Sequence, residues 1–495
     1  MGPLTTEVAG PGLLRTRMRR RERWWALVVV FLVIQIGFLA ASFLAAAIPN
    51  TGIVSHLRSA VKEGELSPLD YSKGSMGDQV DHYTECIALT IGIGNTGYRG
   101  FVRNALADPE LGPCDTAIAR LSAGRAPNRA TGIHRASPHP VSGDFRGPAF
   151  QDYFRYWHGY TIVTRPMLAL FGVAATRALA ALALVASAAW MVMAAGRRLG
   201  WWVPVALTVP FVATVDVWDL PGSIPHALSM AVALAGGALV VARTSGDALS
   251  WVRWPLVAGC LYGFVDLMTN PPLAWALTAW SVAAVCMHRA EPPRRVAAAG
   301  VVATAAWMAG YGGSWAAKWL LDIIVFGWKA FRTQVVHEIA YRAGGSATVR
   351  DVMALNLRFW TGPFGHRSMV VGVVLVASVG VLATEVIRRG TGMPRRRGTE
   401  TTQVLAGFVA LAWPAGLTFA WFALVREQSY IQAFFTYRSL GMSLAIVVAS
   451  ALMLGTRTDY HAARSRAEAG EASEVVSEGS LSEPEPLAAS PPLVP

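Results

Sequence analysis

The sequence predicts an all-α polytopic membrane protein with about ten transmembrane helices and a long extracytoplasmic loop after the first of them. Hydrophobic residues make up 53% of the 495 residues and charged residues only 15%, and the mean hydropathy is +0.39. This composition is typical of multi-pass membrane proteins. Apolar stretches of near-membrane length follow one another, and the arginine-rich short connections between them all fall on one predicted side of the membrane.

The chain begins with a basic N-terminus, residues 1–23, followed by an apolar stretch at residues 24–48. The apolar stretch is too long for the hydrophobic part of a cleavable signal peptide, so we expect an uncleaved first transmembrane helix. The excess of arginine before it predicts a cytoplasmic N-terminus. Residues 49–160 are then expected to form an extracytoplasmic loop domain.

Residues 161–455 are expected to form a transmembrane helical bundle with an outer loop at residues 326–367. Further spans are predicted at about 175–196, 201–216, 224–242, 253–268, 272–288, 296–325, 369–387, 404–424 and 434–455. Residues 456–495 are rich in Ala, Ser, Glu and Pro and show no apolar period, which predicts a disordered cytoplasmic tail. The Ala-, Val-, Gly- and Arg-rich composition favours the cytoplasmic (inner) membrane of a bacterium.

The four cysteines fall into two pairs. Cys86 and Cys114 lie in the predicted extracytoplasmic loop, where an oxidising environment favours a disulfide bond. The chain-entropy model assigns such a bond about 3.5 kcal/mol of stabilisation. Two free thiols are the alternative. Cys260 and Cys286 lie within apolar spans and are expected to act as small packing residues.

Two acidic residues near the start of the loop domain are the candidate catalytic groups. If residues 81–90 are helical, Asp81 and Glu85 lie four positions apart on one face. Two carboxylates on one face suit a site that abstracts a proton or holds a divalent metal. The alternative is an exposed helix start, with acids placed where the helix dipole favours them.

The end of the loop domain is aromatic and basic, with candidate substrate-binding residues Arg155, Tyr156, Trp157, His158, Tyr160 and Arg165. Aromatic side chains at this depth ordinarily anchor a protein in the membrane interface. The functional interpretation is a surface that faces sugar and phosphate, with the Arg165 guanidinium as a bidentate phosphate clamp.

Polar residues near the outer ends of later spans complete the candidate substrate-binding set: Asp266, Lys318, Tyr437 and Arg438. Charges close to a hydrophobic span are costly and face a cavity or form pairs. Pairing between Lys318 and Asp322 is the structural alternative. The net charge of +12 reflects basic residues beside the spans, so we expect no nucleic-acid partner.

Four sequence blocks together carry a resemblance to a known superfamily. They are Asp81-x-Tyr-Thr-Glu, Tyr156-Trp157-His158-Gly159-Tyr160 with Arg165-Pro166, Gly312-Gly313-Ser314-Trp315 with Lys318-Trp319, and Phe434-Phe435-Thr436-Tyr437-Arg438. The set looks like a family of uncharacterised bacterial multi-pass proteins. That family resembles the GT-C superfamily of polyprenyl-phosphate-sugar-dependent glycosyltransferases. The resemblance covers about residues 24–455, and it departs from the GT-C pattern by lacking an acidic doublet in the first loop.

The resemblance implies a glycosyltransferase that works on the outer side of the membrane. A polyprenyl-phosphate-linked sugar would enter from the lipid bilayer, and a cell-envelope glycan, lipid or protein would supply the acceptor hydroxyl. Asp81, or Glu85 as second choice, would remove the hydroxyl proton, and Arg165, Lys318 and Arg438 would neutralise the departing phosphate. No phosphate-cradling glycine loop appears in the chain. A lipid-linked glycan transporter and a non-catalytic scaffold for envelope assembly are the alternatives.

The predicted orientation is tested with reporter fusions after residues 130, 290 and 345. The first and third should report the outside and the second the cytoplasm, because the arginine-rich connections then all lie in the cytoplasm. A cytoplasmic signal at residue 130 would invert the orientation and remove the reason for placing the loop domain outside.

Overall fold

The computed structural model describes residues 11–73, 79–93, 100–112, 114–122, 151–361 and 397–454, with a few isolated residues between 372 and 380. Seven helices in this part of the chain are long and apolar enough to cross a membrane: Trp24–Ala46, Gly172–Leu199, Ile224–Arg243, Ala248–Val265, Pro293–Phe326, Thr402–Leu424 and Ala433–Leu454. They confirm an all-α polytopic membrane protein, whereas the predicted count of ten spans is not confirmed.

The three remaining predicted spans have different outcomes. The expected span at 201–216 is helix α8, Trp202–Thr214, whose 13 residues are too few to cross a bilayer. The span at 272–288 is helix α11, Pro271–His288, and its side chains are almost all buried among the other helices. The span at 369–387 lies almost wholly outside the described residues.

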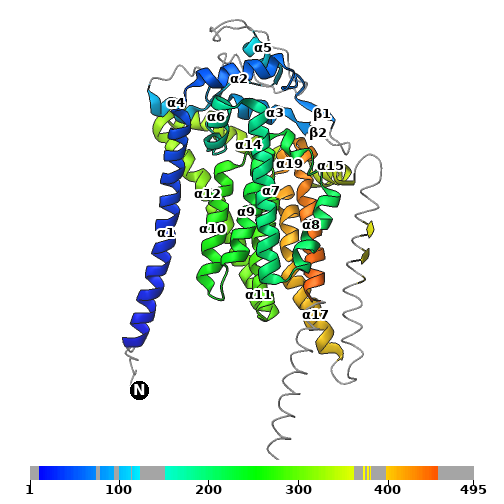
Figure 1. Ribbon diagram of the computed structural model, residues 1–495. Helices are drawn as coiled ribbons and strands as arrows, with labels where there is room; N and C mark the ends of the chain where they lie inside the picture. The colour runs from blue at the N-terminus through cyan, green and yellow to red at the C-terminus, as the bar shows by residue number, and fades with distance from the viewer. Residues whose placement is uncertain are drawn as a thin grey trace, which may run out of the picture.

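The first helix, α1 (Pro11–Ala46), stands beside the bundle and meets it mainly near one end (Figure 1). At that contact Gln35 Nε2 donates to Ser314 Oγ at 3.0 Å, and the rings of Phe38 and Phe264 stack with centroids 4.0 Å apart. Most of the apolar surface of α1 stays exposed, as expected for a helix that contacts lipid.

The described residues between 50 and 170, which we call the cap, cover one end of the bundle (Figure 1). The cap contains helices α2 (Asn50–Lys62), α3 (His82–Thr90), α4 (Phe101–Ala107), α5 (Cys114–Ser122) and α6 (Thr161–Leu170), and strands β1 (Tyr71–Lys73), β2 (Gln79–Asp81), β3 (Pro109–Glu110) and β4 (Gln151–Asp152). The strands form two short antiparallel ribbons, with Ser72 opposite Val80 and Pro109 opposite Asp152. Within the described ranges, these ribbons are the β structure and the other regular elements are helices.

Short helices from later in the chain gather at the capped end of the bundle (Figure 1). They are η1 (Leu220–Gly222), α13 (Trp328–Phe331), the π-helix η2 (Arg332–Val336), α14 (His337–Gly344), α15 (Val349–Thr361), α19 (Arg426–Ile431) and α20 (Ala433–Thr436). The spanning helices below them are α7 (Gly172–Leu199), α9 (Ile224–Arg243), α10 (Ala248–Val265), α12 (Pro293–Phe326), α17 (Arg397–Ala412), η3 (Trp413–Gly416) and α18 (Leu417–Leu424). The segments predicted to face outward therefore lie together at one end.

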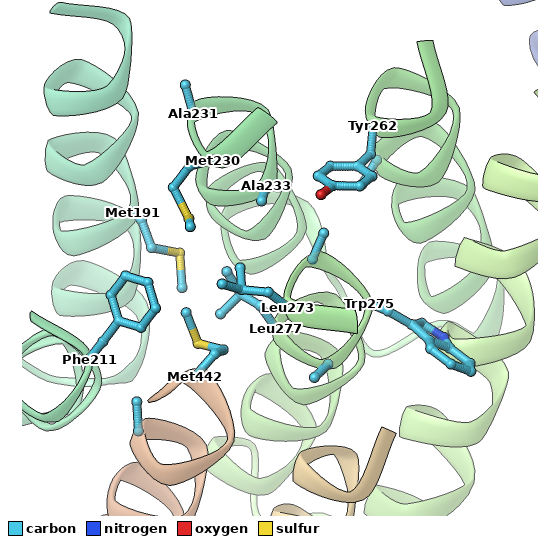
Figure 2. Close-up of a cluster of buried hydrophobic side chains, with 14 of the residues drawn as sticks. Met191, Phe211, Met230, Ala231, Ala233, Tyr262, Leu273, Trp275, Leu277 and Met442 are labelled. Carbon is cyan, nitrogen blue, oxygen red and sulfur yellow. The ribbon is translucent and has the colours of Figure 1, made fainter. Parts of the chain in front are cut away.

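The core of the bundle is built from large side chains around α11. Figure 2 shows Met191, Met230 and Met442 converging with Phe211 on Leu277 of α11. Methionine side chains are flexible and fill irregular gaps between helices of different tilt. Their burial explains why α11 is apolar on every side.

Glycines bring α10 and α12 into the closest helix contact of the bundle. A Cβ atom on Gly310 would lie 2.1 Å from the carbonyl oxygen of Leu256, and one on Gly259 would lie 2.2 Å from that of Trp307. Small residues of this kind let two helix backbones approach within a membrane, where packing replaces the hydrophobic effect as the driving force. Any side chain at either position pushes the two helices apart.

We expect Gly310→Ala to lower the stability of the bundle by roughly 1–3 kcal/mol, because the added methyl group overpacks the contact between α10 and α12. Gly312→Ala is the matched control on the same helix, since no atom lies within 4 Å of its added Cβ. Thermal unfolding of the detergent-solubilised protein measures both. Equal melting temperatures for the two variants would show that the close approach is not required.

Candidate functional site

Asp81 ends strand β2 and caps the N-terminus of α3. Its Oδ1 accepts a hydrogen bond from the Thr84 backbone N–H at 2.9 Å, and its Oδ2 accepts one from the Thr84 hydroxyl at 2.5 Å. The same Oδ2 lies 2.9 Å from Nε2 of His226, on the first turn of α9. Both side chains are almost fully buried, so the cap and the bundle share a buried carboxylate–imidazole pair.

The pair determines which His226 nitrogen carries the proton. The Asp81 carboxylate accepts hydrogen bonds, so Nε2 is the donor and the neutral ring has its lone pair on Nδ1. Nδ1 is buried and has no hydrogen-bond partner within the described part of the chain. The Phe435 ring packs edge-on against the imidazole with centroids 4.6 Å apart, which restricts its rotation. The arrangement therefore holds a proton acceptor ready at the joint between cap and bundle.

Glu85 does not share the surroundings of Asp81, which differs from the predicted two-acid face. Its oxygens form a bidentate pair with Arg177 of α7, at 2.9 Å to Nε and 2.7 Å to a terminal nitrogen. Asp81 faces α9 whereas Glu85 faces α7, because Asp81 belongs to the strand end rather than to the helix. Glu85 is thus a buried half of an ion pair, and a second free base is not present there.

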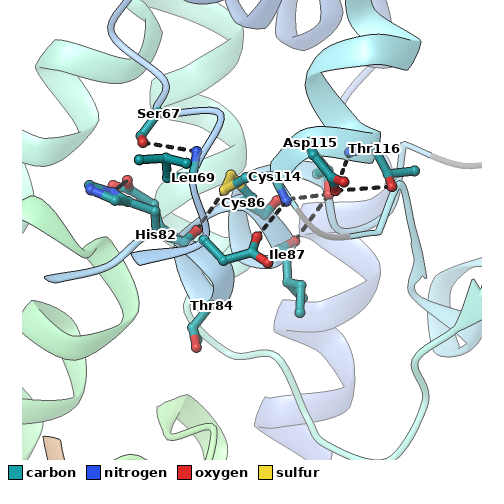
Figure 3. The surroundings of a disulfide bond; sticks show 12 residues. Ser67, Leu69, His82, Thr84, Cys86, Ile87, Cys114, Asp115 and Thr116 are labelled. Atoms are coloured by element: carbon teal, nitrogen blue, oxygen red, sulfur yellow. Dashed lines mark hydrogen bonds and ion pairs between the residues drawn. A yellow bond between two sulfur atoms is a disulfide. The ribbon is translucent and has the colours of Figure 1, made fainter. Parts of the chain in front are cut away.

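The predicted disulfide between Cys86 and Cys114 is confirmed (Figure 3). It joins α3 to the start of α5, next to a hydrogen bond from the Cys114 backbone N–H to Asp70 Oδ1 at 3.2 Å. These links hold the first turn of α3, and with it Asp81, against the rest of the cap. Cys260 and Cys286 are free and buried, as expected for packing residues.

The aromatic block at 156–160 lies inside the joint between cap and bundle. The Trp157 indole donates to the Ser314 carbonyl at 2.7 Å, and the Gly159 backbone N–H donates to the Phe264 carbonyl at 2.7 Å. A Cβ atom on Gly159 would enter the Phe264 ring. Trp157 and the nearly buried rings of Tyr156 and Tyr160 therefore pack the cap against the bundle rather than forming a membrane-interface belt.

Both ring nitrogens of His158 form hydrogen bonds within the cap. Nε2 donates to the Tyr153 carbonyl at 2.6 Å, so Nδ1 accepts from the Tyr160 hydroxyl at 2.9 Å. Burial lowers the pKa of His158 to about 3, so the ring is neutral near pH 7. This satisfied histidine contrasts with His226, whose Nδ1 is unpartnered.

Arg165 donates hydrogen bonds to groups within the protein, whereas the sequence predicted a phosphate clamp. Its guanidinium donates to the carbonyl oxygens of Ala45, Ile48 and Ile91, at 2.8, 2.9 and 3.1 Å, and to the Asn50 side-chain oxygen at 2.7 Å. Four of its five N–H groups are thereby engaged in tying the end of α1 to the cap. These carbonyl groups lie where α1 and α3 end, so the buried guanidinium is engaged within the protein.

Lys318 is likewise engaged within the protein. Its buried Nζ lies 2.6 Å from Asp322 Oδ1, 2.8 Å from the Phe154 carbonyl and 3.4 Å from the Leu106 carbonyl. All three N–H donors of the ammonium group thus have acceptors. Lys318 therefore forms the ion pair with Asp322, one turn away on α12, that was the structural alternative. Its two bonds to carbonyl oxygens join the cap to that helix.

Two arginines at the capped end share one carboxylate. Glu338 of α14 lies 3.0 Å from Arg155 and 2.6 Å from Nε of Arg342, and Arg342 also donates to Gln428 Oε1 of α19. Although burial raises the pKa of Glu338, the two guanidinium groups bring it below its usual range. The trio carries one excess positive charge. Arg155 was among the predicted substrate-binding residues, whereas Arg342 was not.

Asp266, Tyr437 and Arg438 also lie at the capped end. Asp266 Oδ1 accepts hydrogen bonds from the backbone N–H and the hydroxyl of Thr269, and burial raises the pKa of the carboxyl. The Tyr437 hydroxyl accepts from the Asp216 backbone N–H at 3.4 Å, and the Arg438 guanidinium lies 5.6 Å from the Tyr437 ring centroid. Asp81 bonds to Thr84 and His226, and Arg165 bonds to Ala45, Ile48, Asn50 and Ile91. Among these bonds of the described residues, none joins Asp81 or Arg165 to Asp266, Tyr437 or Arg438.

Sequence reasoning left His226, Arg177 and Arg342 out of the candidate site. The signal for His226 was a titratable residue directly after Pro225, in the first turn of an apolar span. Arg177 had no local signal, because its partner Glu85 is 92 positions away, whereas Arg342 has Glu338 four positions before it and its second partner, Gln428, 86 positions after it. In the described ranges, no group of three His, Cys, Asp or Glu side chains is placed to hold a metal ion.

We expect Lys318→Met to destabilise the protein by about 3–5 kcal/mol, because it leaves the Asp322 carboxylate buried without its partner. Adding Asp322→Leu should restore much of the loss, since no uncompensated charge then remains. Lys62→Met, at the exposed end of α2, is the control. Thermal unfolding measures all three, and a Lys318→Met variant as stable as the wild type would contradict the assigned role.

Compared with known proteins, the chain matches no family model, no curated protein and no solved structure. The resemblance to GT-C glycosyltransferases therefore stays a prediction from the sequence blocks. What the chain does has to be argued from the contacts at its capped end.

Proposed function

We propose that this protein is a GT-C-like glycosyltransferase that moves a sugar from a polyprenyl-phosphate donor to a hydroxyl group of a cell-envelope acceptor. The observation that carries the proposal is the buried Asp81–His226 pair at the joint between cap and bundle. In this proposal the capped end faces the outside of a bacterial cytoplasmic membrane, where lipid-linked donors are consumed without a nucleotide at the site.

The reaction needs a group that removes the acceptor proton as the hydroxyl oxygen attacks the sugar. Nδ1 of His226 is the unpartnered acceptor, and Asp81 orients the ring and balances the positive charge that the ring gains. Asp81 is less suited to act alone, because its two oxygens already accept three hydrogen bonds. The proposed base is thus the Asp81–His226 pair, in which Nδ1 of His226 accepts the proton.

The reaction also needs positive charge where the phosphate departs. Arg155 and Arg342 compete for the single carboxylate of Glu338, so the trio has an unbalanced positive charge that an anion would neutralise. The buried Nε of Arg155 has no partner among the described residues, which leaves a donor for that anion. From the sequence, this role was expected of Arg165, Lys318 and Arg438. Four of the five Arg165 N–H groups and all three Lys318 donors already have acceptors within the protein.

The proposed base and the two arginines both lie at the capped end of the bundle. Met268, two residues after Asp266, contacts Arg342 through its sulfur at 3.8 Å. In this proposal the sugar of the donor lies between the base and the arginines.

We expect His226→Gln and Asp81→Asn each to lower sugar transfer by about 10²–10⁴-fold, the usual contribution of general base catalysis. The glutamine keeps a polar side chain but no basic nitrogen, and the asparagine no longer accepts both hydrogen bonds on charged oxygens. Release of polyprenyl phosphate from a panel of polyprenyl-phosphate sugars, with membrane extracts as acceptors, measures the rate.

His337→Gln is the matched control, because His337 is an exposed histidine at the start of α14. It should retain wild-type turnover. Full activity in His226→Gln would refute the assigned base. Wild-type protein that binds but never consumes any donor would favour the scaffold or the transporter instead.

A further inference from the structure

A second arrangement of titratable groups lies in the cap, apart from the Asp81–His226 pair. The Ser72 hydroxyl of β1 is 2.8 Å from Nε2 of His82, the first residue of α3. Nδ1 of His82 faces Glu85 Oε2 at 3.8 Å. A serine, a histidine and a carboxylate therefore stand in a row, in the order used by serine nucleophiles on unrelated folds.

The backbone around this row is held from several sides. Strands β1 and β2 pair with Ser72 opposite Val80, and the Asp70 carbonyl accepts the backbone N–H groups of His82 and Tyr83 at 2.9 and 2.8 Å. The Cys86–Cys114 disulfide lies one turn further along α3, and the Cys114 sulfur contacts the His82 carbonyl (Figure 3). Ser72 on β1 and His82 on α3 thus lie on two elements whose relative position is fixed by these bonds.

The third member of the row is fixed and charged. Arg177 holds both oxygens of Glu85, which is 1% exposed, so the carboxylate has one orientation and faces His82. The 3.8 Å separation is about 1 Å longer than a charge-assisted hydrogen bond, and such bonds in ligand-free sites are often long.

A purely structural histidine is expected to look different. His158 in the same cap has a partner on each nitrogen, whereas Nδ1 of His82 is buried with no hydrogen bond in the described part of the chain. Ser72 is partly exposed, so its hydroxyl is not hidden in the core. The unsatisfied Nδ1 beside a fixed carboxylate is what a base that becomes positively charged requires.

We propose that Ser72 is a nucleophile toward carboxylic esters, which gives the cap an acyl-transfer or ester-hydrolysis activity independent of the proposed sugar transfer. Ser72 Oγ attacks the ester carbonyl carbon while its proton passes to Nε2 of His82. The bond to the leaving alcohol breaks, and that alcohol takes the proton from His82. Water, or a hydroxyl group of an acceptor, then attacks the acyl-serine ester and regenerates the serine.

The test is covalent labelling of the purified full-length protein with a fluorophosphonate probe, with the modified residue located by mass spectrometry. The wild type should be labelled at Ser72, and Ser72→Ala should lose that label. His82→Gln, which can keep a hydrogen bond to Ser72 but cannot take its proton, should slow labelling by at least about 10²-fold. Thermal unfolding of each variant checks that the cap is folded.

Ser67→Ala is the matched control, because Ser67 is a cap serine of similar exposure that accepts from the Leu69 backbone N–H and has no histidine beside it. It should label like the wild type. No label on Ser72 in the wild type, or an unchanged rate in folded His82→Gln, would overturn the proposal. Ser72→Ala should keep sugar transfer, so failure of either proposed activity leaves the other untouched.

Discussion

The structure depends on pairing the charges that are buried where the cap meets the bundle. Glu85 with Arg177, Lys318 with Asp322, and Asp81 with His226 each join a residue in one element to a partner across the joint or one turn away. An isolated ion in such a place costs several kcal/mol, so the Glu85–Arg177 and Asp81–His226 pairs favour the position of the cap that brings their members together. Lys318 and Asp322 lie on one helix, and the Lys318 bonds to the Leu106 and Phe154 carbonyls join this pair to the cap. Arg165 meets the same requirement with carbonyl oxygens instead of a carboxylate.

The all-α membrane-spanning class and the disulfide follow from local properties of the chain, and these parts of the fold were predictable. Apolar runs and arginine-rich connections are read within windows of about 20 residues. Cys86 and Cys114 were the cysteines outside apolar spans. The short helix α8 was harder, because Pro204 and Pro210 interrupt a stretch whose composition alone resembles a span.

The candidate site was predictable only in part, because its contacts join distant parts of the chain. Asp81 was identified from its neighbours, but its partner His226 lies 145 positions away. The acceptors of Arg165 lie 74 to 120 positions away, and the sharing of Glu338 between Arg342 and Arg155 also arises only after folding. The surroundings of these arginines therefore could not be read from the sequence.

Helix α12 has 34 residues and is therefore about 51 Å long, whereas the hydrocarbon layer of a bilayer is about 30 Å thick. In a helix that runs along the membrane normal, about 20 Å of this length would extend beyond the hydrocarbon layer. Lys318 and Asp322, which hold the cap, are near the end where the cap sits. The contacts that hold the cap are thus at the end of α12 that can extend beyond the hydrocarbon layer, so the cap can sit at the level of the headgroups while the rest of the helix spans the lipid.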